Sequence, residues 1–413
     1  MPAVEALRIY RSLNEVQRRT FLACFLGWTL DALDFFLLTF VVKSVAAEFS
    51  VSIVQVTFAI TLTLMMRPLG ALLFGMLGDR FGRRIPLMID IIFFSLMEFL
   101  TAFSPNYTVF LIFRALYGVG MGGEWGLGAS LAMESLPAKA RGLASGILQQ
   151  GYSLGFLLAA VVYWLVFPHF GWRALFIVGA VPALLVLYIR VHVPESPVWE
   201  RQRQTTGERS LGVGRMMTEN WRLLIYAVLL MTAFNYMSHG TQDLYPTFLQ
   251  KQRGLSVNQT APIAIIYNLG AICGGTLLGH FSQSWGRRRT IMIAAGLGVL
   301  LIPVWIFSHT LPLLIAGGFC MQFMVQGAWG VVPVHLNELS PPAWRGTFPG
   351  LVYQLGNFFS ANAAMLQAKL AERFVRPNGQ PDYALTMACV TLTVFVVLIL
   401  LAAIGREERG KEF

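Results

Sequence analysis

Long apolar runs recur along nearly the whole chain, and short charged or Pro- and Gly-containing stretches separate them. Each run is about 18 to 25 residues long, the length that an α-helix needs to cross a hydrocarbon core of ~30 Å. The strands of a membrane β-barrel would be short and would alternate in polarity, and these long apolar runs do not have that pattern. The pattern therefore predicts an all-α membrane protein with about twelve transmembrane helices. We expect these helices at 20–43, 53–77, 85–103, 107–132, 142–166, 171–192, 222–249, 258–281, 290–308, 311–333, 346–368 and 383–404.

Composition supports the membrane interpretation, and charge adds an orientation. Hydrophobic residues make up 56% of the 413 residues, charged residues only 13%, and the formal net charge is +10. Most Lys and Arg fall in connections on one side of the predicted helices, among them Arg83 and Arg288, which is the positive-inside pattern. We expect a multi-pass protein of the cell membrane with both termini in the cytoplasm, and no nucleic-acid binding. The 4 cysteines lie in apolar spans without CxxC spacing, so neither disulfides nor a metal site is expected.

The chain repeats itself at a fixed offset. The segment "GMLGDRFGRR" from Gly75 matches "GHFSQSWGRR" from Gly279, and "ESLPAKARG" from Glu134 matches "ELSPPAWRG" from Glu338, both at a separation of 204 residues. Two matches at one offset predict a duplicated six-helix unit, and such repeats place a binding site near the membrane midplane between the halves. We expect an N-terminal half at 1–193, a cytoplasmic linker at 194–220 and a C-terminal half at 221–413.

Several motifs carry a resemblance to a known family. The segments "GDRFGRR" after the second span, "RALYGVGMGGEWG" in the fourth and "PESPVW" after the sixth together resemble the major facilitator superfamily over essentially the whole chain. Within it, "GWTLDALDFF", "GVGMGGEWG" and "GWRALF" resemble the sialate:proton symporter family, and "NYMSHGTQDLYPTF" resembles its lactate permease branch. The resemblance implies a fold of twelve helices in two six-helix halves, and symport of lactate, pyruvate or related short carboxylates with a proton.

The resemblance also implies a gate on the cytoplasmic side. It assigns charge contacts that hold one access state to Gly78, Asp79, Arg83, Arg84, Glu134 and Arg141. The second half departs from this pattern, because Gln283 and Ser284 stand where the first half has Asp79 and Arg80. We expect asymmetric gating, with a partial copy kept by Arg287, Arg288, Glu338 and Arg345. The alternative is that these charges only set the topology.

Charged residues inside the spans of the first half are candidate transport groups. A charge at the bilayer centre costs about 2.5 to 3.5 kcal/mol and usually faces a cavity or a partner. Asp31 and Asp34 are three residues apart on one helix face, so one of them can hold a proton. Arg67 offers a fork of donors that matches a carboxylate, and Glu124 is a second candidate proton site. The alternatives are an ion pair of Arg67 with either aspartate and a packing contact for Glu124. Asp90, Glu98 and Arg114 are expected to be structural.

The polar segment of the seventh span forms one helix face. Asn235, His239 and Gln242 follow i, i+4, i+7 spacing, and Asp243 lies beside Gln242. An imidazole can donate a hydrogen bond, accept one or take up a proton, so this face suits both substrate and proton binding. A purely structural role is the alternative. Pro246 removes a backbone donor and predicts a kink at the end of this span.

These residues together predict a carboxylate site and its proton groups. In the eleventh span, Gln354 and Asn357 are three residues apart and can hydrogen-bond a carboxylate opposite Arg67. The predicted substrate-binding residues are Arg67, Asn235, His239, Gln354 and Asn357. The predicted proton-coupling residues are Asp31, Asp34, Glu124 and Asp243.

The absence of enzymatic motifs narrows the predicted activity to secondary transport. Neither HExxH nor GxxxxGK[ST] is present, and the GxSxG match at 151–155 lies inside a span rather than at a strand-to-helix turn. We therefore expect no enzyme, no metal and no cofactor other than the coupling proton. The expected function is symport of short monocarboxylates with a proton by alternating access. A sialic acid or dicarboxylate symporter is the first alternative and a non-transporting carboxylate sensor the second, and the oligomeric state stays open.

Overall fold

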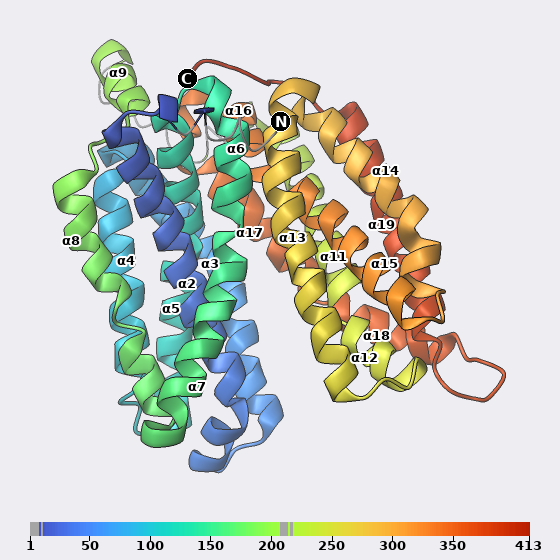
Figure 1. Cartoon of the computed structure of the whole chain (residues 1–413). Coiled ribbons are helices and arrows are strands. Elements are labelled where there is room, and N and C mark those ends of the chain that lie inside the picture. The colour runs from blue at the N-terminus through green and yellow to red at the C-terminus, as the bar shows by residue number, and fades with distance from the viewer. Residues whose placement is uncertain (1–7, 10, 207–213, 215–217) are drawn as a thin grey trace.

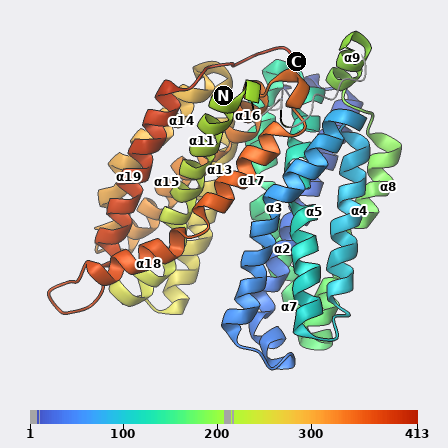
Figure 2. The same ribbon diagram turned by 180° about the vertical axis from the view of Figure 1, so that it is seen from behind.

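The structure, a computed structural model, is a bundle of helices in two halves that lie side by side (Figure 1). It describes residues 8–9, 11–206, 214 and 218–413, so part of the predicted linker at 194–220 lies outside the described residues. Viewed from behind, α3, α4 and α5 face the viewer in one half, and α11, α17 and α19 in the other (Figure 2). The predicted all-α class and the arrangement in two halves are confirmed.

The helices follow the predicted spans in order. The N-terminal half contains α2 (Glu15–Glu48), α3 (Ile53–Phe81), α4 (Arg84–Thr101), α5 (Tyr107–Ser135), α6 (Ala138–Gln149), α7 (Gly151–Val178) and α8 (Pro182–His192), and α9 (Pro197–Thr206) follows it. The C-terminal half contains α11 (Trp221–Gln242), α12 (Tyr245–Thr247), the π-helix η1 (Phe248–Gln252), α13 (Val257–Trp285), α14 (Arg287–Ile306), α15 (Leu311–Trp329), α16 (Val332–Leu339), the 3-10 turn η2 (Pro342–Trp344), α17 (Phe348–Ser360), α18 (Ala363–Arg373) and α19 (Tyr383–Ile404).

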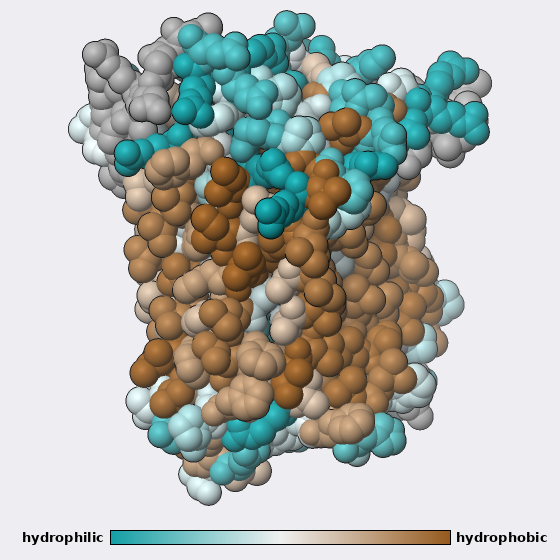
Figure 3. All heavy atoms as spheres, turned by 90° about the vertical axis from the view of Figure 1, so that its left-hand side faces the viewer, coloured by the Kyte–Doolittle hydropathy of each residue, from teal (hydrophilic) through white to brown (hydrophobic). Residues whose placement is uncertain are grey.

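A belt of apolar side chains lies between two hydrophilic ends of the bundle (Figure 3). Among the described residues, 8 helical stretches are long and apolar enough to cross a membrane, and one of them, Ala138–His192, holds the fifth and sixth predicted spans. The third, fourth and eleventh predicted spans are helical but less uniformly apolar. Asp90 and Glu98 interrupt the apolar sequence of α4, and Arg114 and Glu124 interrupt that of α5, which is also rich in glycine. The eleventh span is divided between the two shorter helices α17 and α18.

Two helix breaks have a clear local cause. Around Pro246 the chain leaves regular α-helix, because α11 ends at Gln242 and α12 and η1 follow; proline has no N–H to donate to the preceding turn. The second break separates the fifth and sixth spans within α7 at Gly171, whose φ of 71° lies in the left-handed region that favours glycine. The kink predicted from Pro246 is thus present.

Two seams of close backbone contact join the halves at one end of the bundle. In the α6–α13 seam, a Cβ added to Gly142 would lie 2.7 Å from the carbonyl oxygen of Gly279. In the α3–α17 seam, a Cβ added to Gly75 would lie 3.1 Å from the carbonyl oxygen of Gly346. Both pairs are related by the repeat, since each residue of one pair stands 204 residues from a residue of the other. Glycine is therefore required where the two halves cross.

Hydrogen bonds between the halves gather at the same end. Ser145 Oγ in α6 donates to the Gly330 carbonyl (2.7 Å) and accepts from the Val334 N–H (3.1 Å). Ser130 Oγ in α5 donates to the Arg345 carbonyl (2.6 Å). Toward the opposite end the helices of the two halves diverge (Figures 1 and 2). We call the joined end the closed end, and it is the end at which α9 and α16 lie (Figure 1).

Candidate functional site

Arg67 is buried in α3 where this helix packs on α5, and only 3% of it is exposed. Gly122 makes the close packing possible, because a Cβ at that position would lie 2.0 Å from the Arg67 carbonyl oxygen. The Nε and Nη2 atoms of Arg67 have no hydrogen-bond partner among the described residues. A buried guanidinium with unpaired donors is costly, and an acceptor such as a carboxylate would relieve that cost.

Groups from four helices interact electrostatically with Arg67. They are Asp31 of α2, Glu124 of α5, Tyr152 of α7 and Tyr353 of α17. Tyr353 belongs to the C-terminal half and the other three to the N-terminal half. Arg67 therefore lies close to titratable groups of both halves.

The two aspartates of α2 have different surroundings. Both interact electrostatically with Glu98, but the nearby arginine is Arg67 for Asp31 and Arg114 for Asp34. Glu98 and Arg114 form a buried salt bridge of their own. The carboxyl oxygens of Asp31 and Asp34 have no hydrogen-bond partner among the described residues, and within the same residues no salt bridge joins either aspartate to Arg67. The guanidinium that is directly paired is thus that of Arg114, and Arg67 keeps free donors.

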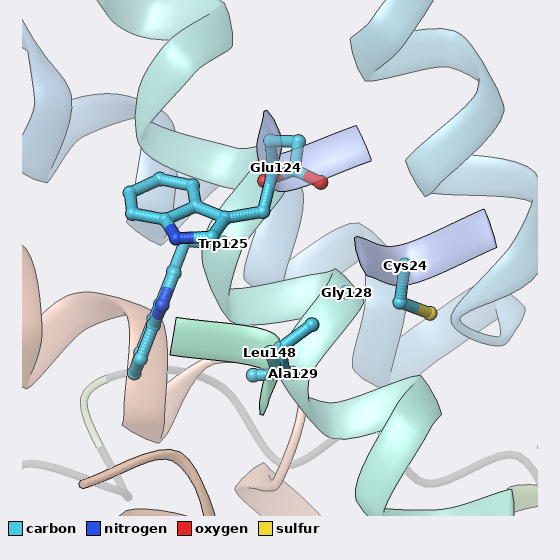
Figure 4. A pocket seen from close by; sticks show the side chains of 7 residues that line it. Cys24, Glu124, Trp125, Gly128, Ala129 and Leu148 are labelled. Atoms are coloured by element: carbon cyan, nitrogen blue, oxygen red, sulfur yellow. The ribbon is translucent and has the colours of Figure 1, made fainter. Parts of the chain in front are cut away.

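Glu124 lines a narrow pocket with an empty volume of about 140 Å³ (Figure 4). The other lining residues are Cys24, Trp28, Trp125, Gly128, Ala129 and Leu148. Gly27 permits the approach of α2, because a Cβ there would lie 2.4 Å from Glu124 Oε1. Neither carboxyl oxygen has a hydrogen-bond partner in the part of the chain that the structure describes. This space consists of gaps too narrow for a water molecule, so the pocket does not hold a substrate beside Glu124.

Tyr353 reaches into a group of tryptophans from both halves. Its ring stacks on Trp125, with 4.2 Å between ring centroids, and meets Trp28 and Trp329 edge-on at 6.5 and 5.8 Å. The Trp329 indole N–H in turn donates to Ser238 Oγ of α11 (2.6 Å). Sequence reasoning did not select these rings, because aromatic residues occur in most spans and their spacing alone marks no contact between halves.

The residues on the polar face of α11 have different hydrogen-bond partners. His239 Nδ1 lies 3.0 Å from Asp243 Oδ2, and these side chains are 41% and 30% exposed. Asn235 is buried, and its amide donates to a carbonyl of its own helix (2.8 Å). Gln242 instead donates to Gln322 of α15 (3.1 Å), a residue that sequence reasoning missed because a single amide in an apolar span carries no periodic signal. His239 and Asp243 are therefore the accessible members of the face.

Gln354 and Asn357 of α17 form one hydrogen-bonded group with Tyr353. Asn357 Nδ2 donates to Gln354 Oε1 (3.0 Å), and the Tyr353 hydroxyl is hydrogen-bonded to Asn357 and to Gln149 of α6. Gln354 is fully buried, and its Nε2 has no partner among the described residues. The group thus offers an unused N–H donor in the same region as the unused donors of Arg67.

Asp79 connects the two halves at the closed end. Its carboxylate accepts hydrogen bonds from the N–H of Gly346 (2.7 Å), from the N–H of Thr347 (3.0 Å) and from the Thr347 hydroxyl (2.6 Å). Arg83 holds the same carboxylate at 3.0 Å from its Nη1. Gly346 and Thr347 directly precede α17, where unpaired N–H groups and the helix dipole favour a negative charge.

The other predicted gate residues support Asp79 from within the N-terminal half. Arg83 makes a bidentate ion pair with Glu134 (3.2 and 3.1 Å) and donates to the Gly78 carbonyl (2.6 Å). Glu195 accepts from the N–H groups of Arg83 (2.7 Å) and Arg84 (3.1 Å). Burial raises the pKa of Glu195, and these backbone hydrogen bonds oppose the shift. Sequence reasoning quoted the motif that contains Glu195 but gave it no role.

The C-terminal half contains an incomplete copy of this arrangement. Arg287 pairs with Glu338 (2.9 and 3.0 Å), and Glu407 accepts from the Arg287 N–H (3.1 Å), as Glu195 does in the first half. Gln283, at the position equivalent to Asp79, accepts from Arg287 Nη2 (2.7 Å) within its own half. The hydrogen bonds that Asp79 makes across the halves thus have no counterpart from the Gln283 side-chain oxygen.

Two further arginines lie at the closed end. Arg141 donates from Nε to the carbonyls of Met133 (3.0 Å) and Leu136 (3.2 Å). Arg345 Nη1 lies 3.9 Å from Glu134 Oε1 across the halves, and its Nε and Nη1 have no hydrogen bond to any described residue. Burial lowers the pKa of Arg345, and the Glu134 carboxylate opposes this shift. An incompletely paired guanidinium limits how strongly this end is held together.

The chemistry available is the binding of an anion and of protons. Arg67 supplies a buried positive charge, and Asp31, Asp34 and Glu124 supply buried carboxyl groups. Among the described residues, no group of three or more His, Cys, Asp or Glu side chains is placed to hold a metal ion. Buried charges in an apolar belt, between two halves joined at one end, are the features of a membrane transporter.

Comparison with known proteins identifies the family. A family model described as the Major Facilitator Superfamily matches residues 24–365, and the chain belongs to this superfamily. It is an integral membrane transporter and not an enzyme. The solved structure of the proton:xylose symporter XylE has the same fold, with a TM-score of 0.77 at 19% identity over 96% of this chain and 97% of that one.

Two relatives carry names that concern acids. A carboxylic acid transporter protein homolog from Saccharomyces cerevisiae is 30% identical, over 93% of this chain and 67% of that protein. The sialic acid transporter NanX from Escherichia coli is 27% identical, over 97% of both chains. The expected resemblance to the superfamily and to its sialate and carboxylate members is confirmed.

Proposed function

We propose that this protein is a secondary active transporter that moves short monocarboxylates, such as lactate and pyruvate, together with a proton by alternating access. The observation that carries the proposal is Arg67, a buried guanidinium beside Tyr353 of the other half with two donor atoms that no described residue accepts from. A fork of N–H donors matches the two oxygens of a carboxylate. Relatives named as transporters of carboxylic acid and of sialic acid support the same chemical class.

Proton coupling follows from the charges around Arg67. A carboxyl group that is buried without a hydrogen-bond partner is less costly when neutral, and Asp31, Asp34 and Glu124 are of this kind. Asp31 also interacts electrostatically with Arg67. A substrate carboxylate bound to Arg67 would offset the positive charge that stabilises ionised Asp31, so substrate binding favours proton binding. Asp243, which lies 3.0 Å from His239, is a further proton group of this mechanism.

Alternating access uses the closed end as its gate. The hydrogen bonds of Asp79 to Gly346 and Thr347 hold the halves together there, and their rupture would open the site to that side. The basic residues at this end, such as Arg83 and Arg288, support a cytoplasmic location for it by the positive-inside rule, and we infer that both termini lie on that side. In this orientation the structure corresponds to a state that is closed toward the cytoplasm.

A dicarboxylate or sialic acid substrate is the second candidate function. A second carboxylate would call for a second cation, and the spans of the C-terminal half carry no Lys or Arg at mid-depth. This composition favours monocarboxylates over dicarboxylates. The similarity to the sialic acid transporter NanX is the observation that supports the sialic acid alternative. Competition of labelled lactate uptake by pyruvate, succinate and sialic acid separates the three classes.

The test is uptake of labelled lactate into proteoliposomes. A monoanion that moves with one proton transfers no net charge, so an imposed pH gradient should drive accumulation, whereas a membrane potential, worth ~2.3 kcal/mol per charge per 100 mV, should not. Vesicles that contain the Arg67→Ala variant are the control for leak. Accumulation that responds to a potential alone would contradict coupling to one proton, and the absence of uptake of every acid tested would contradict the substrate class.

A further inference from the structure

The segment Arg406–Phe413, which follows α19, crosses the closed end from the C-terminal half to the N-terminal half (Figure 1). Its first part is fixed to the C-terminal half. Glu407 accepts from the N–H groups at the start of α14, and the Gly410 N–H donates to Glu338 Oε1 (3.1 Å). Its last part reaches the other half, where the Lys411 carbonyl accepts from Arg141 Nη1 (2.7 Å). We call this segment the strap.

The Phe413 ring contacts one arginine from each half. The guanidinium carbon of Arg141 lies 3.7 Å from the ring centroid, and that of Arg345 lies 4.0 Å from it. The two arginines occupy equivalent positions in the repeat, 204 residues apart. Both cations are attracted to the negative face of the ring, which therefore offsets the repulsion between two positive charges that the closed end brings together.

A ring in contact with both halves can keep both contacts only while the halves stay together at this end. Opening of the closed end would move Arg141 and Arg345 apart, because they belong to different halves. At least one of the two contacts with Phe413 would then be lost. The strap thus interacts differently with the two access states, which is the condition for shifting the balance between them.

We propose that the strap stabilises the state in which the closed end is shut, through the contacts of Phe413 with Arg141 and Arg345, and that its release accompanies opening. The inference rests on the alternating access of the proposed function and not on the identity of the substrate. A state-selective strap would regulate transport, because any partner or modification that removed the ring from between the arginines would favour opening.

The test measures the separation of the halves at the closed end in the full chain. Lys139 of α6 and Arg289 of α14 are exposed there and lie in different halves, so both are replaced by cysteine for spin labelling after removal of the native cysteines. Without substrate, Phe413→Ala should raise the ratio of separated to closed molecules about five- to thirtyfold, as expected from two cation–π contacts. Phe413→Tyr keeps an aromatic face and should leave the ratio close to that of the parent protein.

Three comparisons keep this test decisive. Phe413→Leu keeps apolar volume without the ring, so it should shift the ratio as Phe413→Ala does even if the alanine variant folds poorly. Phe170→Ala, at a residue that is 73% exposed and directly precedes the break in α7 at Gly171, should change nothing. An unchanged ratio in Phe413→Leu, or an equal shift in Phe413→Tyr, would overturn the proposal. Lactate uptake is measured separately. If the protein does not transport lactate but the ratio still shifts in Phe413→Leu, the proposed substrate is wrong and the proposed role of the strap is supported.

Discussion

The carboxylate of Asp79 accepts hydrogen bonds from both the hydroxyl and the N–H of Thr347, although the two residues belong to different halves. Thr347 directly precedes α17, so the acceptor is a full negative charge at a helix N-terminus. The interaction is directional and local, and a small rotation of one half would break it. The equivalent residue in the second half is the uncharged Gln283, whose oxygen accepts from a neighbour in its own half.

Asp79→Asn should weaken the closed end without removing the side chain. The amide keeps one acceptor oxygen but loses the charge that the start of α17 and Arg83 both stabilise. Hydrogen bonds to charged groups contribute about 1.5–3 kcal/mol, so the ratio of closed to open molecules should fall by about one to two powers of ten. Spin-label distances between Lys139→Cys and Arg289→Cys measure the shift. The matched control is Glu48→Gln, which removes a carboxylate that ends α2 and pairs with Arg173 of its own half, and an equal shift in both variants would reject the gate.

Gly146→Ala should prevent full closure of the α6–α13 seam. A Cβ at this position would lie 2.4 Å from the Gly275 carbonyl oxygen, and a backbone atom cannot move aside as a side chain can. Overpacking of this kind costs about 1–3 kcal/mol, and here it falls on the closed state alone. The transport rate should drop while expression stays normal. The control is Gly296→Ala in α14, where an added Cβ meets nothing within 4 Å. Unchanged uptake by Gly146→Ala would show that the seam can open without loss of activity.

Arg67→Lys tests whether a fork of donors is needed rather than a charge. Lysine keeps the positive charge near Asp31 but cannot form two parallel hydrogen bonds to a carboxylate. The KM for lactate should rise about tenfold or more, since one charged hydrogen bond is worth about 1.5–3 kcal/mol. Initial rates of uptake over a range of lactate concentrations measure this. Arg289→Lys makes the same exchange at an exposed arginine and should leave the KM unchanged. A normal KM in Arg67→Lys would argue against direct binding of the carboxylate.

Asp243→Asn separates a substrate role of the α11 face from a proton role. His239 Nδ1 lies 3.0 Å from Asp243 Oδ2. An asparagine at position 243 keeps the shape of the side chain but neither takes up nor releases a proton. As a proton group, Asp243 is needed for uphill transport only. We therefore expect accumulation driven by a pH gradient to fall at least tenfold, while exchange of labelled for unlabelled lactate continues. Loss of both activities would instead indicate that the pair contacts the substrate or holds the helix.

The spans and the two halves could be predicted because physical limits act on them directly. Hydrocarbon thickness fixes the length of an apolar helix, and a duplicated unit leaves the same motif twice, as at Gly75 and Gly279. The boundaries of the helices were harder to predict where charged residues or helix breaks interrupt an apolar run. Asp90 and Glu98 make α4 less apolar, and the chain divides the eleventh span between α17 and α18, which no pattern in the sequence marked.

The surroundings of the candidate site residues depend on contacts between helices, which spacing on one helix does not reveal. Asp31 and Asp34 are three residues apart and both interact with Glu98, yet the arginine that interacts with Asp31 is Arg67 and the one that interacts with Asp34 is Arg114. Glu407 was not predicted, because its carboxylate caps backbone N–H groups that belong to a distant helix and leave no trace in side-chain identity. Residue types that bind protons and anions could be selected from sequence, but their partners could not.

The two seams that join the halves resist separation in physically different ways. At the α3–α17 seam, charged hydrogen bonds act over a short range and break as a set, so their contribution depends on the charge state of Asp79. At the α6–α13 seam, Gly142 and Gly279 bring backbones into van der Waals contact, and each such contact is weak but many are lost together when the seam separates. The two seams thus differ in what must be lost on opening, so the halves would resist separation unequally on the two sides, which an exactly symmetric pair of halves would not do.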